Sequence, residues 1–185
     1  MSNKKIIFGI AGEIAAGKDT VSAYLVKKYK ASFYNFSDPL RDILKRLYKD
    51  VARLNLNLLS TGLRQAFGED YLVEVILKDI EKNKSIISVV SAIRRLKEVE
   101  SLRKVDNFKL IYVMANEKTR YERLTSRSSQ YVDDKIKTFA EFKKDHSLTT
   151  EIEITKIKEK ADFIIDNSKD LKHLHIQIDE MIKKS

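Results

Sequence analysis

The most specific chemical signal in the sequence is a glycine-containing segment close to the N-terminus. Residues 12–20 read GEIAAGKDT, the pattern G-x-x-x-x-G-K followed by an aspartate and a threonine. An apolar run at residues 4–10 comes before it and helical spacing of apolar residues comes after it, which is the context of a phosphate-binding P-loop. Only five glycines occur in the chain and three of them stand at positions 9, 12 and 17. The segment therefore predicts a phosphate-binding loop.

Each part of such a loop contributes to holding a nucleotide. Backbone N–H groups surround the phosphate oxygens, and the positive end of the following helix attracts negative charge. Lys18 adds a compact positive charge for the β- and γ-phosphates. We expect ATP to contact the whole segment: Gly12, Glu13, Ile14, Ala15, Ala16, Gly17, Lys18, Asp19 and Thr20.

The loop departs from the usual pattern directly after its lysine. Asp19 stands where a serine or threonine normally binds Mg²⁺, and Thr20 follows one residue later. A carboxylate can hold the ion directly or through water, and a threonine hydroxyl can take the same place. We expect Mg²⁺ to accompany ATP, with Asp19 or Thr20 as its ligand.

The elements that must position this loop alternate between strands and helices. Four further apolar runs predict strands at residues 32–37, 85–91, 108–114 and 162–166, with helical patterning between them. Strands that alternate with helices of this length indicate right-handed crossovers. The sequence therefore predicts an α/β domain with a five-stranded parallel sheet and helices on both faces.

Charged residues follow the carboxyl ends of these strands, where ligands bind in such folds. Asp38 follows the second strand, where it would orient or deprotonate an acceptor hydroxyl, bind the Mg²⁺ shell or cap the next helix. Arg41 comes one turn later, and Arg94 follows the third strand. Arg123 and Arg127 are four residues apart on one face of a predicted helix, so both would reach a triphosphate.

Several segments, taken in order, resemble P-loop nucleotide kinases. The ending of the loop, residues 17–20, is similar to deoxynucleoside monophosphate kinases, and FSDPLR at 36–41 resembles the acceptor-site Asp-x-x-x-Arg of those enzymes and of dephospho-CoA kinases. IRRLKEVE at 93–100 resembles a block in nucleotide-kinase-like proteins related to both and to adenylate kinases. Residues 119–127 are similar to their lid helix, and ADFIIDN at 161–167 to their last strand, which ends in an asparagine beside the adenine.

The resemblance implies a three-layer P-loop NTPase fold with strand order 2-3-1-4-5 and a small helical lid. One kinase domain would span residues 1–185, with an acceptor-binding helical segment at about 39–83 and the lid at about 120–147. Four residues would be catalytic: Lys18, Asp38, Arg123 and Arg127. Four would bind the acceptor: Asp38, Arg41, Arg64 and Arg94. Asn167 would lie beside the adenine.

The third predicted strand differs from these relatives at its end. They carry an aspartate just before the Ile-Arg pair, as a second-sphere Mg²⁺ group, whereas this chain has Ser91 and Ala92. A serine can hydrogen-bond a metal-bound water but brings no charge. Either Asp19 or Asp38 supplies the missing negative charge, or catalysis is weak.

Composition excludes several other classes of protein. No apolar run approaches the roughly 18 residues that cross a bilayer. The chain has no cysteine for disulfides or zinc-thiolate sites, and its N-terminus is too polar for a signal peptide, so we expect a cytoplasmic protein without a membrane partner. The formal net charge of +9 attracts phosphates of any kind. Because no helix-turn-helix, zinc or RNA-recognition signature accompanies it, nucleic acid is not indicated as a partner.

We therefore expect ATP- and Mg²⁺-dependent phosphoryl transfer to a small nucleotide-like acceptor, foremost a (deoxy)nucleoside monophosphate, because Arg41 and Arg64 would clamp an acceptor phosphate. Dephospho-CoA kinase, whose acceptor is a ribose hydroxyl, is the alternative. From another class, a non-catalytic P-loop nucleotide-binding regulator is the second alternative. The sequence leaves open whether the protein forms a homodimer.

Overall fold

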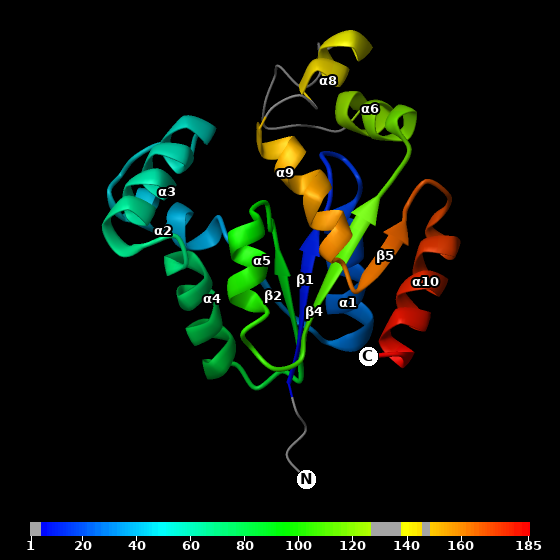
Figure 1. The fold of residues 1–185 in the computed structure, drawn as a ribbon, viewed down its shortest axis with the longest axis horizontal. Helices are drawn as coiled ribbons and strands as arrows, with labels where there is room; N and C mark the ends of the chain where they lie inside the picture. The colour runs from blue at the N-terminus through cyan, green and yellow to red at the C-terminus, as the bar shows by residue number, and fades with distance from the viewer. Residues whose placement is uncertain (1–4, 127–137, 146–148) are drawn as a thin grey trace.

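Five short runs of β-branched and aromatic residues form one parallel sheet at the centre of the molecule (Figure 1). The computed structural model describes residues 5–126, 138–145 and 149–185. Its strands are β1 (Ile6–Ala11), β2 (Ser32–Asn35), β3 (Ile87–Ser91), β4 (Phe108–Met114) and β5 (Phe163–Asp166). They are hydrogen-bonded in the order β2-β3-β1-β4-β5, and every pair is parallel. The predicted α/β fold and strand order are confirmed.

Helices cover both faces of the sheet, because alternate residues of each strand point to opposite sides. On one side, Phe8 and Ile10 of β1 pack with α1 (Lys18–Tyr29) and α10 (Leu171–Lys183). On the other side, Ile7 and Ala11 belong to a core shared with α2 (Asp38–Arg46), α4 (Tyr71–Lys82), α5 (Leu96–Leu102) and α9 (Thr149–Ile157). The two cores explain why the central strands are apolar throughout.

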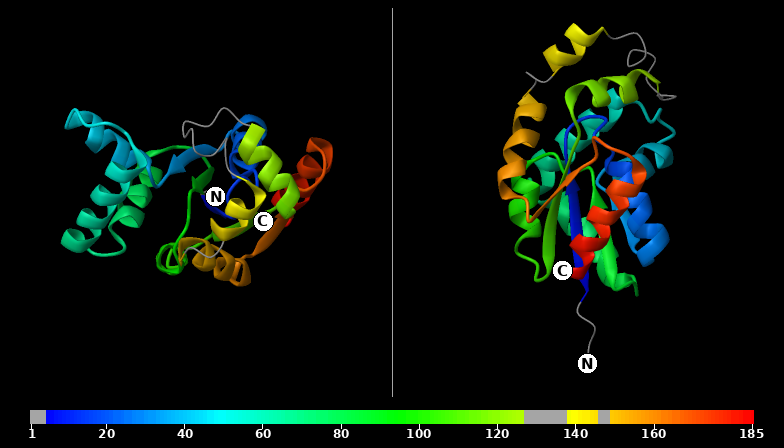
Figure 2. Two further views of the ribbon diagram at one scale, coloured as in Figure 1. Left: turned by 90° about the horizontal axis from the view of Figure 1, so that it is seen from above. Right: turned by 90° about the vertical axis from the view of Figure 1, so that its right-hand side faces the viewer.

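The remaining helices lie around the end of the sheet at which the strands finish. Figures 1 and 2 show α6 (Glu117–Ser126) and α8 (Phe139–Asp145) above this carboxyl edge, and α3 (Arg53–Phe67) beside it together with α2. Part of the predicted lid, and the predicted catalytic Arg127, lie outside the described residues. The division into acceptor segment and lid stays a prediction. Over the described residues, no helix combines the length and the apolar character that crossing a membrane requires.

The loops at the carboxyl edge contain backbone conformations that non-glycine residues seldom adopt. Ala15, in the loop after β1, has φ of 58°, and Ala92, directly after β3, has φ of 66°. Such conformations cost of order 1–3 kcal/mol each and persist where surrounding contacts impose them. After β2, α2 begins at Asp38, one residue earlier than expected, so Ser37 and not Asp38 is the residue flanking the helix. The same positive-φ conformation also occurs at Lys30, before β2, and at Asn107, before β4, so it is not confined to the carboxyl edge.

On the face of the sheet that α1 and α10 cover, hydrogen bonds to Asp179 join these two helices; they are called the polar clasp. The carboxylate of Asp179 accepts hydrogen bonds from Lys28 at 2.7 Å, Tyr29 at 2.7 Å and Tyr24 at 2.9 Å. Lys28, and then Tyr29, lower the pKa of Asp179 to about 2. The same contact with Asp179 raises the pKa of Lys28. The clasp therefore links the two helices most firmly while both groups are charged.

Replacing Asp179 with asparagine should make the stability of the protein less dependent on acid pH. The folded pKa of Asp179 lies below the unfolded value of about 3.9, so its stabilising effect is complete above about pH 4 and is lost as the pH falls toward 2. We expect the melting temperature of Asp179→Asn to lie below that of the wild type at pH 7, and the difference to shrink between pH 4 and pH 2. Circular dichroism melts over this range measure it, with the exposed Asp42→Asn as the control.

Candidate functional site

The loop between β1 and α1 lies so close to two neighbouring strands that glycine is required at both of its ends. Gly12 and Gly17 have φ of 148° and 97°. A Cβ on Gly12 would overlap the backbone carbonyl oxygen of Val113 in β4, and one on Gly17 would overlap the side-chain amide of Asn167 after β5. The two glycines of the sequence pattern therefore let the loop pack directly against the ends of the neighbouring strands.

Lys18 is folded across this loop. Its ammonium donates hydrogen bonds to the carbonyl oxygens of Gly12 at 2.8 Å and Glu13 at 2.9 Å. Asp19 and Thr20 are exposed in the first turn of α1. A phosphate oxygen could replace either carbonyl as a partner of Lys18. Gly12 and Ala16 of the same loop are buried.

Two arginines of α6 face the loop. Arg120 forms an ion pair with Glu13 at 3.0 Å, and only 5% of its side chain is exposed. Arg123 donates to the backbone oxygen of Asn167 at 3.0 Å, and the Asn167 side chain donates to the backbone oxygen of Ala16 at 2.9 Å. Arg120 was not among the predicted site residues; its spacing of three from Arg123 is the signal that would have found it.

These two guanidinium groups retain buried hydrogen-bond donors that have no partner within residues 5–126, 138–145 and 149–185. They are Nε and Nη1 of Arg120 and Nη1 of Arg123. A buried N–H group without an acceptor is costly, and an anion would satisfy it with charge-assisted hydrogen bonds. The Arg120 guanidinium also lies 5.5 Å from the centre of the Phe142 ring in α8. The charge and the unused donors of the two arginines are suited to an anion, although the donor atoms are buried in this structure.

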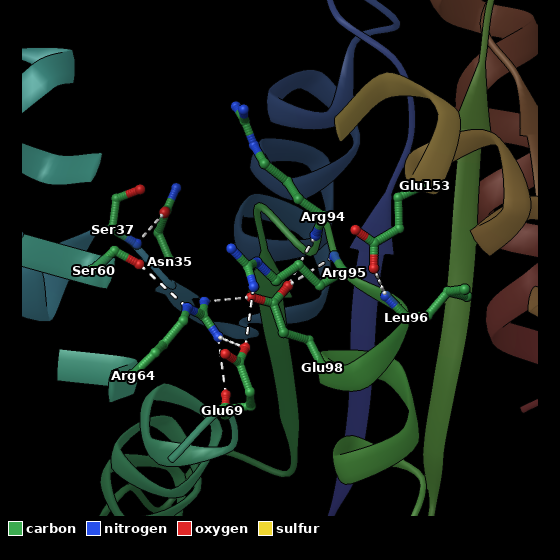
Figure 3. A network of polar contacts seen from close by, with 10 residues as sticks. All are labelled: Asn35, Ser37, Ser60, Arg64, Glu69, Arg94, Arg95, Leu96, Glu98 and Glu153. Atoms are coloured by element: carbon green, nitrogen blue, oxygen red, sulfur yellow. Dashed lines mark hydrogen bonds and ion pairs between the residues drawn. The ribbon is translucent and has the colours of Figure 1, made fainter. Parts of the chain in front are cut away.

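The predicted acceptor residues divide into two groups. Asp38 and Arg41 form an ion pair at 3.1 Å with about half and 39% of their side chains exposed. Arg94 is exposed, and Figure 3 shows its side chain extended away from Glu98. Arg64, in contrast, is 7% exposed and pairs with Glu98 at 2.9 Å. The geometry leaves Asp38, Arg41 and Arg94 accessible to a ligand, whereas the guanidinium of Arg64 is already engaged.

The described residues contain no cluster of three or more histidine, cysteine, aspartate or glutamate side chains that would enclose a metal. Mg²⁺ in phosphoryl-transfer sites needs no such cage, because phosphates and water supply most of its ligands. Asp19 and Thr20, exposed beside the loop, are suitable for the remaining positions. Ser91, at the end of β3, is 2% exposed. The residues present are therefore compatible with an ion bound mainly by the nucleotide.

Comparisons with known proteins agree with this architecture. No protein-family model matches the chain. It is 32% identical to a UPF0200 protein of Staphylothermus marinus over 125 residues, which are 68% of this chain and just under two thirds, 65%, of that protein. With a UPF0200 protein of Methanocaldococcus jannaschii it shares 28% identity over 97% of this chain and 90% of the relative.

Solved structures with the same fold include small-molecule kinases. Shikimate kinase from Bacteroides thetaiotaomicron superimposes with a TM-score of 0.63 at 13% identity, covering 97% of both chains. Protein TT1252 from Thermus thermophilus gives 0.61 at 16% identity, covering 98% of both. At these identities the likeness shows a P-loop kinase-like fold.

Gly12→Ala should damage the loop, and Gly62→Ala is a matched control. The added Cβ at position 12 meets the fixed carbonyl of Val113 and the φ is unfavourable, so we expect a loss of about 1–3 kcal/mol in unfolding free energy. Gly62 lies within α3 with open space around it, so alanine there should be neutral or gain up to about 1 kcal/mol. Urea unfolding of both variants measures the two changes. Equal stability of the two variants would contradict this account of the loop.

Proposed function

We propose that this relative of the UPF0200 proteins transfers the γ-phosphoryl group of ATP, with Mg²⁺, to a small nucleotide-like acceptor. The observation that carries the proposal is the meeting of the loop with α6. Arg120 of α6 pairs with Glu13 of the loop at 3.0 Å, and Nη1 of Arg123, which has no partner among the described residues, lies next to Gly17, directly before Lys18. Positive charge on both sides of a phosphate is what phosphoryl transfer requires.

The chemistry needs little covalent participation from the protein. Charge in the transition state spreads over the equatorial oxygens of the transferred group, so fixed donors that face those oxygens lower the barrier. Lys18 would bind the β- and γ-phosphates, and Arg123 would stabilise charge on the moving group. When bound, Mg²⁺ would neutralise phosphate charge, with Asp19 or Thr20 as protein ligands. Arg127 keeps its predicted role beside Arg123.

The acceptor would occupy the opposite part of the carboxyl edge. Asp38 would orient or deprotonate an acceptor hydroxyl, while Arg41 and Arg94 would bind an acceptor phosphate. Two accessible arginines favour a (deoxy)nucleoside monophosphate. Asp38 favours an acceptor hydroxyl, as in dephospho-CoA.

A non-catalytic nucleotide-binding regulator is the second candidate. The observation that favours it is the end of β3, where Ser91 is buried and brings no charge for a metal-bound water. A regulator would bind ATP at the same loop without releasing ADP when acceptors are added. The two candidates are separated by assaying ADP release with nucleoside and deoxynucleoside monophosphates, dephospho-CoA and shikimate as acceptors.

Lys18→Ala should abolish acceptor-dependent ADP release. Its ammonium is the positive charge that the loop itself would bring to the phosphates, so we expect a fall in rate of about a hundredfold or more. Lys18 lies outside both hydrophobic cores, so the melting temperature should change little. The exposed Lys27→Ala, on the same helix, is the control for lost surface charge. A Lys18→Ala variant with the wild-type rate would show that the loop does not serve the reaction.

Arg123→Ala should lower the rate of transfer more than the affinity for ATP. A donor that acts on charge developing in the transition state affects the rate constant most. We expect a loss of at least about tenfold, or roughly 1.4 kcal/mol, in single-turnover rate. Parallel ATP titrations should show a smaller change, because the loop amides and Lys18 still hold the phosphates.

Lys118→Ala is the matched control for this experiment, since Lys118 is exposed on the same helix. It should change neither quantity. Equal losses of rate and ATP affinity in Arg123→Ala would mean that Arg123 binds only the ground state, which would contradict its assigned role.

A further inference from the structure

A buried ion pair between Arg64 and Glu98 lies beneath the acceptor side of the site (Figure 3). The two side chains come from α3 and α5, and are 7% and 4% exposed. Replacing a buried ion pair with apolar residues of similar size is often neutral or stabilising, so stability alone is a weak reason for such a pair. Its contacts indicate another role.

Glu98 uses both oxygens of its carboxylate. Oε1 accepts from Arg64 at 2.9 Å, while Oε2 accepts from the backbone N–H groups of Arg94 at 2.9 Å and Arg95 at 3.2 Å. These amides belong to the loop between β3 and α5, which leaves β3 through the left-handed conformation of Ala92. A loop that starts in an unfavourable conformation depends on such contacts to keep its shape.

Arg64 is likewise engaged through every part of its guanidinium. Nε donates to the hydroxyl of Ser60 at 3.3 Å, and Nη1 to the backbone oxygen of Glu69 at 2.9 Å. The carboxylate of Glu69 also pairs with Arg95 at 3.0 Å. The network therefore joins α3, the turn before α4 and the β3–α5 loop.

Arg94 differs from the other arginines of this network. Its backbone is fixed by Glu98, but its guanidinium has no partner among the described residues (Figure 3). A fixed backbone with an unengaged charged side chain at the carboxyl edge is suited to meeting an anionic ligand. The polar network thus ends in one group directed to the site.

We propose that Glu98 is a positioning residue: by binding the amides of Arg94 and Arg95 it holds the Arg94 guanidinium toward the acceptor, and Arg64 holds the Glu98 carboxylate in place. The proposal rests on the proposed function, in which Arg94 binds the acceptor. It gives Arg64 an indirect role in place of the direct acceptor contact expected from the sequence.

The test compares two variants that differ only at position 98. Arg64→Met with Glu98→Leu removes both buried charges and leaves the two amides without an acceptor. Arg64→Met with Glu98→Gln also removes the charges but keeps one oxygen for the amides. We expect acceptor kcat/KM to fall about tenfold or more in the leucine variant and to recover most of this loss in the glutamine variant. The KM for ATP should stay unchanged in both.

Arg94→Ala completes a double-mutant cycle. If Glu98 acts through Arg94, adding Arg94→Ala to the leucine variant causes no further loss, although it lowers kcat/KM in the wild type. Hydrogen exchange gives a readout without catalysis: the amides of Arg94 and Arg95 should exchange faster in the leucine variant than in the glutamine variant. If the leucine variant does not fold, Glu98→Gln alone takes its place in the test. An acceptor kcat/KM lower than that of the wild type should then go together with lower protection of the Arg94 amide against hydrogen exchange.

A similar pair at the other end of the sheet provides the control. Asp162 pairs with Arg103 at 3.0 Å and accepts from the backbone N–H of Leu110 at 2.7 Å. Arg103→Met with Asp162→Leu should leave acceptor kinetics unchanged. Equal kinetics of the leucine and glutamine variants, or additive losses with Arg94→Ala, would overturn the positioning role alone. No ADP release by the wild type with any acceptor would instead overturn the proposed function, and this inference with it.

Discussion

The packing of the P-loop against β4 and the end of β5 is the contact on which the rest of the site depends. Gly12 lies against the backbone of Val113, and Gly17 against the side chain of Asn167. Asn167 then bonds both Ala16 and Arg123, so the position of the loop also fixes one side chain of α6. These contacts involve backbone atoms and a buried amide, so they fix the loop relative to β4, to the residue that follows β5 and to α6.

The desolvation cost of the buried charges is compensated differently on the proposed acceptor side and on the proposed nucleotide side. On the acceptor side, Arg64 and Glu98 satisfy each other and several backbone groups, so their desolvation is compensated within the protein. On the nucleotide side, Arg120 is compensated only in part, by Glu13, and keeps two buried donors without partners. A phosphate there would supply the missing acceptors. The buried charges of Arg64 and Glu98 are therefore compensated within the protein, whereas that of Arg120 is compensated only in part among the described residues.

Much of the fold could be predicted from the sequence, because its strands are short buried runs and its loop has a pattern with a physical cause. The five strands and their order follow from apolar runs, crossovers and the resemblance to nucleotide kinases. Long-range pairing could not be predicted in the same way. The sequence predicts that Arg64 binds an acceptor phosphate, because nothing in it shows that Glu98, 34 residues later, forms an ion pair with Arg64. Arg120 does carry a local signal, its spacing of three from Arg123, but nothing in the sequence shows that its partner Glu13, more than 100 residues earlier, reaches it. The roles assigned to the site residues stay predictions.

The placement of the buried charges is itself an argument for where the function lies. Among the described residues, the charged side chains classed as buried are Arg64, Glu98 and Arg120. All three adjoin loops at the carboxyl edge of the sheet: Glu98 binds the loop after β3, Arg64 binds Glu98, and Arg120 binds the loop after β1. Burying a charge is costly, and the chain places most of its 36 lysine and arginine residues where water solvates them. Because buried charge adds little to stability, its gathering at one edge of the sheet supports the proposal that this edge is the functional one.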